Sequence, residues 1–501
     1  MSAACIRVWT DRPKAVIHPN IYGHFAEHLG RCIYEGIWVG PTSKAPNENG
    51  IRLDVIAALK QLRAPVVRWP GGCFADMYHW KSGVGPPKKR PSKVNVWWRQ
   101  AEPNTFGTDE FVGFCRAVGC ESYLCVNVGT GTPREAVEWL EYCNFGGDSS
   151  LSRRRVAAGR GSPAVSPYGV KYWGVGNENW GCGGRFTAPD YAKEYVRFAS
   201  FLRAMDPSIE LIACGCSPMD YKNAGLVSWN HDFCEAMPHA DLIDQLSIHR
   251  YFGRGHGSQF SDSEYLALFG DLITMERDIE QADELLGYFY PDKFVGLAVD
   301  EWGVWHPSAV VDNGLEQENT LRDAVFAGAC LNLFNQHAGR VTMANLAQTI
   351  NVLQCLGFTN GGRMCLTPTY HVYDMMRYHM GAQLLSHDVD CPTFEVHPVG
   401  LKAKHEAPYL SVSVSMARKK VLVTVANQTV DQDVETRIDL RGAGIASVMG
   451  RVLNSPDPRD TNTLDTPRTV FPKRIKRESV QGELVHVFPA HSFTSLNISL
   501  A

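Results

Sequence analysis

The sequence lacks the features that define several large classes of protein. No stretch approaches the roughly eighteen consecutive apolar residues of a membrane-spanning helix. The 45 glycines and 28 prolines form no repeat and no low-complexity segment, which excludes collagen-like and disordered chains. The amino terminus has no basic segment followed by a long apolar one, so we expect no secretion signal and a cytoplasmic location.

The chain also has little net charge. Its 49 Lys and Arg residues nearly balance 53 Asp and Glu residues, for a formal charge of −4. No broad positive field is present to attract a polyanion, so we predict no nucleic-acid partner. With 501 residues, 44% of them hydrophobic, the chain can build a large barrel with an accessory domain, or two to three average domains.

The fifteen cysteines include no Cys-x-x-Cys pair. A zinc ribbon and a thioredoxin-type site are therefore unsupported. Because the cysteines are scattered, mostly through apolar segments, we predict buried, reduced thiols, and we predict neither a metal ion nor a cofactor.

Between about residue 18 and residue 350, short runs rich in Val, Ile and aromatic residues alternate with helical patterns. This alternation is typical of βα units that build a parallel sheet. Eight such strands favour a (β/α)8 barrel over an open sheet, which has about six. We expect strands at 21–25, 65–69, 123–127, 170–174, 210–213, 244–248, 294–298 and 341–344, and helices at 52–62, 108–118, 133–143, 189–205, 263–286, 319–337 and 370–377.

The pattern changes near residue 384. Short alternating strands without intervening long helices predict an antiparallel β-sandwich, jelly-roll-like in outline. Its expected strands include 409–414, 420–426, 435–440 and 483–488. We expect an amino-terminal strand at 4–10 to pair with this sandwich, because neither has a partner in the barrel. The predicted domains are an amino-terminal strand (1–15), a catalytic barrel (16–380) and an all-β domain (381–501).

Two glutamates follow barrel strands at their carboxyl ends, where the active sites of such barrels lie. Glu178 comes after the fourth strand and Glu301 after the seventh. Each alone could as readily cap a loop or pair with an arginine, but two facing carboxylates are what glycoside hydrolysis requires. We therefore predict Glu178 and Glu301 as a catalytic pair. We expect flat surfaces for sugar rings from four nearby tryptophans: Trp173, Trp180, Trp302 and Trp305.

Other strand ends supply candidate supporting groups. Arg68 would favour the ionised form of Glu301, and the negative charge of Glu301 would raise the pKa of Glu178. Arg68 could instead be a paired ion of the barrel interior, and Gln348 could cap the last strand. The further strand-end candidates are Glu27, His249 and Tyr251.

One competing motif is the His-x-x-Glu-His pattern of a family of zinc proteases, matched at His24, Glu27 and His28. Zinc binding there requires a helix that brings both histidines to one face. The segment instead has the pattern of a strand running into a loop, so we expect no zinc and place the histidines at the barrel mouth or in the core.

Six segments together resemble the intracellular α-L-arabinofuranosidases of glycoside hydrolase family 51. They occur in the family's order, and the β-rich tail fits the family's carboxyl-terminal sandwich. The resemblance implies an exo-acting, retaining hydrolase that releases terminal arabinofuranosyl groups from arabinan, arabinoxylan or arabino-oligosaccharides. It also implies that Glu178 is the acid/base and Glu301 the nucleophile. The segments are Ile21–His28, Arg68–Phe74, Gly174–Gly181, Leu246–His249, Val299–Trp305 and Met343–Gln348.

The resemblance further implies that Asn177 binds the sugar 2-hydroxyl and that Arg68 lies beside the nucleophile. It implies a furanose pocket lined by Glu27, Cys73, His249, Tyr251, Trp305 and Gln348. The family is commonly oligomeric, often hexameric, and uses no cofactor. The sequence departs from the family at the 153–166 loop, the Gly181–Gly184 turn and Arg250, which leaves the outer subsites open.

Two alternatives to this function stay open at this point. A hydrolase of another sugar, such as a galactofuranosidase or an endo-glucanase, could use the same barrel, because pocket depth decides the substrate. A carbohydrate-binding protein without catalysis is the alternative from a different class.

Overall fold

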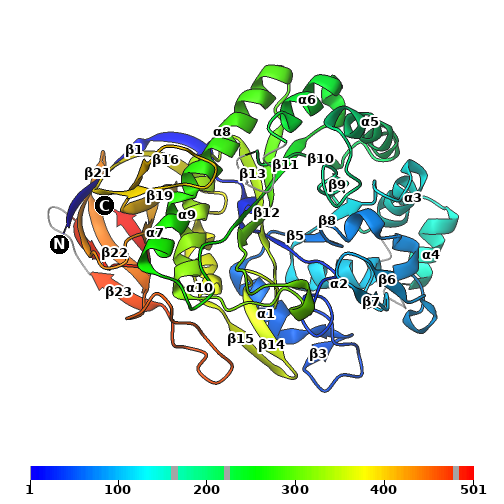
Figure 1. Cartoon of the computed structure of the whole chain (residues 1–501), viewed down its shortest axis with the longest axis horizontal. Helices are drawn as coiled ribbons and strands as arrows, with labels where there is room; N and C mark the ends of the chain where they lie inside the picture. Colours follow the sequence, from blue (N-terminus) through cyan, green and yellow to red (C-terminus); the bar gives the residue numbers. More distant parts are fainter. Residues whose placement is uncertain (1, 159–166, 219–225, 478–483) are drawn as a thin grey trace.

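The computed structural model describes residues 2–158, 167–218, 226–477 and 484–501. Its larger part is a closed barrel of eight parallel strands in the order β10-β11-β12-β13-β2-β5-β8-β9 (Figure 1). The barrel strands are β2 (Gly23–Phe25), β5 (Val66–Trp69), β8 (Glu121–Val126), β9 (Tyr172–Val175), β10 (Glu210–Cys214), β11 (Gln245–Phe252), β12 (Gly296–Val304) and β13 (Val341–Ala347). All eight expected strands are present, so the (β/α)8 prediction is confirmed.

Helices surround the barrel. They are α1 (Leu53–Leu62), α2 (Thr108–Val118), α3 (Pro133–Asn144), α4 (Ser150–Ala158), α5 (Ala188–Met205), α6 (Trp229–Ala236), α7 (Asp262–Gly270), α8 (Leu272–Phe289), α9 (Leu321–Gln336) and α10 (Pro368–Met376). The long helix expected at 263–286 is wrong in one respect: it is two helices, α7 and α8, divided at Asp271. None of the helices in the described ranges has the length and apolar character needed to cross a membrane.

Two short helices, α4 and α6, were not predicted from the sequence. Helix α4 has little apolar surface, and one of its buried residues is Arg155. The Arg155 guanidinium donates to the carbonyl oxygens of Tyr142 and Phe145 at the end of α3. Because a polar side chain provides the contact, hydrophobic periodicity carries no signal of this helix.

The remainder of the chain forms a nine-stranded sheet in the order β23-β22-β25-β20-β19-β16-β1-β21-β24. All neighbours are antiparallel except β1 and β21. The strands are β1 (Ser2–Val16), β16 (Gln383–Asp390), β19 (Leu410–Ala417), β20 (Lys420–Asn427), β21 (Val434–Arg441), β22 (Ile445–Leu453), β23 (Lys473–Arg477), β24 (Leu484–Phe488) and β25 (Ser492–Leu500). They enclose a separate apolar core, and the predicted carboxyl-terminal β domain is confirmed.

The described part of the chain also contains four two-stranded hairpins. They are β3 (Asn47–Glu48) with β4 (Ile51–Arg52), β6 (Lys93–Asn95) with β7 (Gln100–Glu102), β14 (Gly357–Asn360) with β15 (Arg363–Leu366), and β17 (Thr393–Val396) with β18 (His405–Pro408). A 3-10 helix at Ala75–Met77 follows β5 and lies near the barrel mouth.

The chain enters and leaves the barrel at adjacent points. Strand β1 lies between β16 and β21 in the sheet, and just after it the backbone of Ile17 exchanges hydrogen bonds with Gly381 and Ala382. These contacts support the division that we propose for the domains, at residues 1–15, 16–380 and 381–501.

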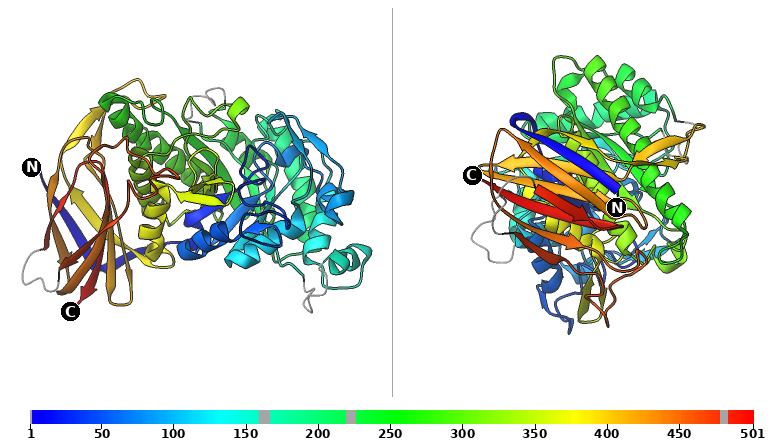
Figure 2. Two further views of the ribbon diagram at one scale, coloured as in Figure 1. Left: turned by 90° about the horizontal axis from the view of Figure 1, so that it is seen from below. Right: turned by 90° about the vertical axis from the view of Figure 1, so that its left-hand side faces the viewer.

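Helix α9 joins the barrel to the sheet domain. Every residue from Leu321 to Asn335 is buried. Figure 2 shows this part of the chain between the barrel and the nine-stranded sheet. The Asn332 amide donates to the Ser411 carbonyl at 2.9 Å, and a Cβ added at Gly328 would lie 2.4 Å from the Phe493 ring. The apolar core of the barrel therefore extends through α9 to Phe493 of β25, and it is distinct from the core that the sheet encloses itself.

Candidate active site

An irregularity in β12 points two consecutive carboxylates into the barrel. Ile248 of β11 pairs with Val299, but the next residue, His249, pairs with Glu301, so Asp300 is an extra residue in the register. Side chains of a regular strand alternate between faces, and an inserted residue breaks that alternation. Asp300 and Glu301 therefore both reach polar partners inside the barrel.

The same alternation corrects the expectation for two of the tryptophans. Trp173 and Trp302 are fully buried against the helix layer, where they contact Trp139 of α3 and Phe334 of α9. The prediction that they provide sugar surfaces is wrong. Trp180 and Trp305 are partly exposed, and Trp305 packs edge-on against Tyr251 with ring centroids 5.2 Å apart.

Glu301 is a buried carboxylate held by two donors. Arg68 Nη1 lies 2.7 Å from Oε1, and the Tyr251 hydroxyl donates to Oε2 at 2.7 Å. Burial alone would raise the pKa of Glu301, but His249, Arg68 and the Tyr251 hydrogen bond outweigh it and hold that pKa below its usual range. Glu301 is thus ionised at neutral pH, as a nucleophile requires.

Removing the Tyr251 hydroxyl tests this electrostatic arrangement. That hydrogen bond stabilises the Glu301 carboxylate, so Tyr251→Phe should raise the pKa of Glu301. The acid limb of kcat/KM should move to higher pH by about one unit, the equivalent of one hydrogen bond. Tyr195→Phe is the matched control, because its hydroxyl bonds the Leu242 carbonyl in the helix layer. An acid limb that is unchanged in Tyr251→Phe would show that another group sets it.

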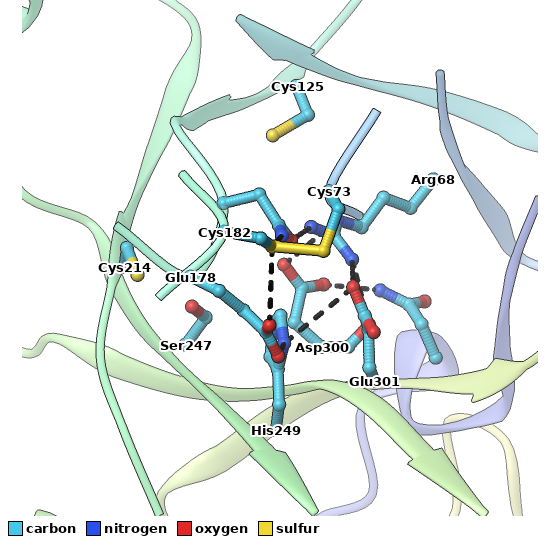
Figure 3. Close-up of polar contacts among 12 residues, drawn as sticks. Arg68, Cys73, Cys125, Glu178, Cys182, Cys214, Ser247, His249, Asp300 and Glu301 are labelled. Atoms are coloured by element: carbon cyan, nitrogen blue, oxygen red, sulfur yellow. Dashed lines mark hydrogen bonds and ion pairs between the residues drawn. A yellow bond between two sulfur atoms is a disulfide. The ribbon is translucent and has the colours of Figure 1, made fainter. Parts of the chain in front are cut away.

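Glu178 lies opposite Glu301, on the turn after β9. Its backbone is left-handed, with φ of 42°, and its carbonyl accepts hydrogen bonds from Gly181 and Gly183 that close the turn. His249 Nδ1 is 2.9 Å from Oε1 of Glu178 and 3.6 Å from Oε1 of Glu301 (Figure 3). One carboxylate oxygen of Glu178 and one of Glu301 lie within 4.8 Å of each other.

His249 lies between the two carboxylates and is itself buried. Burial acts to lower its pKa, but the negative Glu301 and the hydrogen bond to Glu178 raise it above its usual value. The imidazole therefore favours a protonated state that carries positive charge between the two acids.

Arg68 connects the Glu301 carboxylate to the interior of the barrel. Its Nη1 contacts Glu301, its Nη2 donates to Asn177 Oδ1, and its Nε lies 3.3 Å from Asp300 Oδ2. Asp300 also accepts hydrogen bonds of 2.6 Å from Tyr123 and Asn345. Arg68 is thus both a paired interior ion and a member of the site. Asp300 was not predicted from the sequence as part of the site.

Glu27 forms a second buried acidic position beside the pair. Its Oε1 accepts from the Phe74 backbone N–H at 3.1 Å and from Trp98 Nε1 at 2.9 Å, and its Oε2 accepts from Gln348 Nε2 at 3.2 Å. Burial, reinforced by the negative Glu301, raises the pKa of Glu27 to about 7. Near neutral pH this carboxyl group can therefore either donate to or accept from a sugar hydroxyl. Trp98 was not predicted, because it follows no barrel strand.

The His-x-x-Glu-His segment does not have the geometry of a zinc site. His24 is in strand β2, where it faces Tyr373 at a ring distance of 5.1 Å. His28 follows in a loop and lies 2.7 Å from Glu102. As expected from the sequence, the segment is a strand running into a loop, and its two histidines contact different partners.

Two cysteines at the barrel mouth contradict the prediction of reduced, buried thiols. Cys73, in the turn after β5, forms a disulfide with Cys182, in the turn after β9, and both residues are partly exposed. Other cysteines of the described residues, such as Cys125 and Cys214, are free thiols. The two partners are 109 residues apart in the sequence, and only closure of the barrel brings their turns together, so spacing gave no signal of the bond.

A buried acid missed from the sequence fixes the Glu178 turn. Asp76 Oδ1 accepts from the backbone N–H groups of Val128 and Gly129, at 2.7 and 2.8 Å. Its Oδ2 accepts from the Asn177 backbone at 2.7 Å and from the Asn179 amide at 3.2 Å. Burial raises the pKa of Asp76 to about 7, although these four donors oppose that shift. Asp76 therefore holds the strand ends of β8 and β9 together.

Replacing Asp76 tests this positioning role. Asp76→Ala leaves the backbone donors of Val128, Gly129 and Asn177 buried without an acceptor, so the free energy of unfolding should fall by about 2 to 4 kcal/mol. Because Glu178 loses its support, kcat should fall more than KM rises. Urea unfolding and steady-state kinetics measure the two effects. Asp109→Asn is the control, since that acid bonds Tyr142 and Tyr168 away from the mouth. Equal losses of kcat in Asp76→Ala and Asp109→Asn would show that Asp76 does not position Glu178.

The ten residues predicted from the sequence thus lie around one mouth: Glu178 and Glu301, with Glu27, Arg68, Cys73, Asn177, His249, Tyr251, Trp305 and Gln348 in contact with them or with one another. Gln348 follows β13 directly, and its backbone N–H donates to the Val352 carbonyl.

Comparison with known proteins identifies the family of the chain. Residues 58–259 match the α-L-arabinofuranosidase 1 domain, and residues 300–492 match the α-L-arabinofuranosidase C-terminal domain. An intracellular exo-α-L-arabinofuranosidase of Bacteroides ovatus is 37% identical over 99% of this chain and 96% of its own length. The crystal structure of the GH51 arabinofuranosidase from Xanthomonas axonopodis pv. citri has a TM-score of 0.92 and 35% identity, with full coverage of both chains.

A second solved structure, the arabinose complex of the Thermotoga maritima α-L-arabinofuranosidase, has a TM-score of 0.86 and 33% identity over 99% of this chain and all of that one. These similarities extend over both the barrel and the sheet domain. The chain is a member of glycoside hydrolase family 51, the α-L-arabinofuranosidases.

Proposed function

We propose that this protein is an exo-acting α-L-arabinofuranosidase that releases terminal arabinofuranosyl groups by a retaining double displacement. The observation that carries the mechanism is the approach of Glu178 and Glu301, with carboxylate oxygens within 4.8 Å of each other. Retaining glycosidases have carboxyl groups about 5 to 5.5 Å apart, whereas inverting enzymes need about 6.5 to 9.5 Å to admit a water. The spacing supports retention.

In the first step, Glu301 attacks the anomeric carbon while Glu178 gives its proton to the glycosidic oxygen. The bond to the leaving group breaks, and an arabinosyl ester of Glu301 forms. Arg68 and Tyr251 hold Glu301 ionised and aimed. Asn177 binds the sugar 2-hydroxyl in this proposal, and its contacts with Arg68 and Asp76, which fix it from two sides, support that role.

In the second step, water enters in place of the leaving group. Glu178, now ionised, takes a proton from this water, which attacks the anomeric carbon and frees Glu301. Two inversions at one carbon give net retention. His249, within 3.6 Å of both carboxylates, can compensate the change of charge that Glu178 undergoes between the steps.

The furanose pocket that we propose is formed by Glu27, Cys73, His249, Tyr251, Trp305 and Gln348. Its polar groups are fixed by hydrogen bonds, from Gln348 to Glu27, between His249 and Glu178, and from Tyr251 to Glu301, which suits the recognition of one small sugar with several hydroxyls. Supporting the substrate class, the Bacteroides ovatus relative is named as an exo-α-L-arabinofuranosidase and the Thermotoga maritima structure contains arabinose. We expect arabinan, arabinoxylan and arabino-oligosaccharides as natural substrates.

An aryl α-L-arabinofuranoside tests the function directly. We expect rapid hydrolysis of this substrate and little turnover of aryl galactofuranosides or of β-glucan. Proton NMR of the first-formed product should show the α-anomer before mutarotation. Binding without turnover over hours would favour the non-catalytic alternative, and preferred cleavage of another glycoside would change the substrate. A first-formed β-anomer would contradict double displacement.

We further propose that the enzyme acts inside the cell as a homo-oligomer, with a hexamer expected. The name of the Bacteroides ovatus relative supports the location. Sedimentation velocity of the purified protein would measure the mass: about six chains per particle is the expected result, and a monomer at micromolar concentration would contradict it. Immunodetection in fractionated cells would test the location.

A further inference from the structure

The Cys73–Cys182 disulfide lies directly against the proposed acid/base. Cys182 Sγ is 3.6 Å from Oε2 of Glu178, on the opposite side of that carboxylate from His249 (Figure 3). The turn with Cys182 also carries Glu178. The turn with Cys73 also carries Gly71, which lies against the Glu27 side chain, and Gly72, which lies against the Glu301 side chain. Neither cysteine has a part in the two displacement steps.

These cysteines differ from the other thiols near the site. Cys125 and Cys214 are fully buried and bond the backbone, Cys125 to the Gly176 carbonyl and Cys214 to the Asn179 N–H. Cys73, Cys182 and Glu178 are each partly exposed. A small reductant or an ion that enters the mouth can therefore reach all three.

We propose that reduction of this disulfide creates a binding site for a thiophilic divalent cation such as Zn²⁺, formed by Cys73, Cys182 and Glu178. A dithiol provides the reduction by exchange. It transfers two hydrogen atoms and becomes a disulfide, while the bond between Cys73 and Cys182 becomes two thiols. The cation then displaces the thiol protons, since thiolates are the ligating form.

The geometry fits such a cation. One ligand atom from each of the three residues lies within 4.8 Å of the others, so a point exists within about 2.8 Å of all three (4.8 Å divided by √3). Reduction frees the two sulfurs from bonding distance, and rotation of the cysteine side chains must then separate them to roughly 3.7 Å, so that each lies about 2.3 Å from one tetrahedral zinc ion while the Glu178 oxygen lies about 2.0 to 2.2 Å from it. The Cα atoms of the cysteines are 5.5 Å apart, so both thiolates can point at one ion. Three protein ligands leave a fourth position for water.

The consequence for catalysis rests on the proposed role of Glu178. A carboxylate bound to the cation cannot carry the proton that the leaving group requires, so the metal-loaded enzyme should lose acid catalysis. Reduction alone should leave the enzyme active, because Asp76 still holds the Glu178 turn through its own hydrogen bonds. The site therefore makes inhibition by Zn²⁺ conditional on the redox state.

Metal binding can be measured without any substrate. The full-length protein is prepared in an oxidised form and in a form reduced with dithiothreitol and then desalted without oxygen. Thiol titration should show two more thiols in the reduced form. We expect calorimetry to detect one high-affinity Zn²⁺ per chain in the reduced form only. When Cd²⁺ is added to the reduced form, we expect a thiolate charge-transfer band in the ultraviolet spectrum.

Variants at the three proposed ligands test which residues bind the cation. Cys182→Ser and Cys73→Ser should each abolish the reduction-dependent Cd²⁺ band, and Glu178→Gln should weaken Zn²⁺ binding while the band remains. Cys120→Ser is the matched control, because Cys120 is a partly exposed thiol beside a second cysteine, Cys115, away from the mouth. Loss of the band in Cys120→Ser, or a band in wild type no larger than in Cys182→Ser, would overturn the proposal.

Kinetics separate this proposal from the proposed function. Zn²⁺ should lower the activity of the reduced enzyme on a poor-leaving-group arabinofuranoside by roughly 100-fold, the typical contribution of a general acid, and a chelator should restore it. The oxidised enzyme should be unaffected at the same concentration. Stoichiometric binding at Cys182 with unchanged activity would leave the metal site standing and contradict the acid/base role of Glu178.

Discussion

Replacing Glu301 by alanine is expected to abolish hydrolysis of every substrate, including activated aryl arabinofuranosides. Without the carboxylate no glycosyl-enzyme ester can form, so both displacement steps fail. We expect kcat to fall on the order of 10⁴-fold or more, the scale seen when a covalent nucleophile is removed from an enzyme. Stopped assays with long incubation and freshly purified protein would measure the residual rate.

The variant must be shown to fold, because Glu301 is a buried partner of Arg68. Glu301→Gln keeps the shape and one oxygen for the Tyr251 hydroxyl, and it should be nearly as inactive as the alanine variant. Glu121→Ala, at an exposed position at the start of barrel strand β8, should keep wild-type activity. A Glu301→Ala enzyme with a normal circular dichroism spectrum and substantial activity would exclude the nucleophile assignment.

Replacing Glu178 by alanine is expected to have an effect that depends on the leaving group. A phenolate of low pKa leaves without protonation, so formation of the ester should be slowed little. Alkyl and sugar leaving groups need the proton, and their kcat/KM should fall by roughly 10² to 10⁴-fold. A plot of log kcat/KM against leaving-group pKa, nearly flat for wild type, should become steep.

Azide gives an independent test of the same residue. In Glu178→Ala the ester should accumulate, because no base activates water for the second step. Azide attacks without such help, so it should raise the turnover of activated substrates and give an arabinosyl azide of retained configuration. The wild-type enzyme under the same conditions is the control. A variant with uniform losses across leaving groups and no response to azide would contradict the acid/base role.

Much of the barrel could be predicted from the sequence, because its signal is local. Strands such as Val66–Trp69 are short apolar runs, and helices such as α2 (Thr108–Val118) repeat apolar residues at helical spacing. The elements that were missed depend on tertiary contacts. Helix α4 is anchored by the buried Arg155, and the division between α7 and α8 at Asp271 coincides with an ion pair to Arg254. The spacing of apolar residues along the sequence gives no indication of such contacts.

The candidate site was predictable to the extent that it follows strand ends. Glu178 follows β9, whereas Glu301 lies inside the carboxyl-terminal half of β12, which continues to Val304, beyond the predicted end at residue 298; the structure brings the two together. Trp302 was predicted by the same rule, but its side chain points away from the barrel interior, toward Phe334 of α9. The extra residue in β12 changes which face each later side chain occupies, so position along the strand could not predict this orientation. Asp76 and the Cys73–Cys182 bond escaped prediction, since their partners are distant in the sequence and meet only in the closed barrel.

The burial of helix α9 from Leu321 to Asn335 limits how this protein can be rearranged by recombination. One of its faces belongs to the barrel and the other to the β domain, so neither domain contains a finished surface without it. A gene fusion that supplied a foreign carboxyl-terminal domain would have to reproduce the fit between Gly328 and Phe493. The barrel is therefore not an exchangeable module: a replacement for the β domain would have to match the buried face of α9 against which the present one packs.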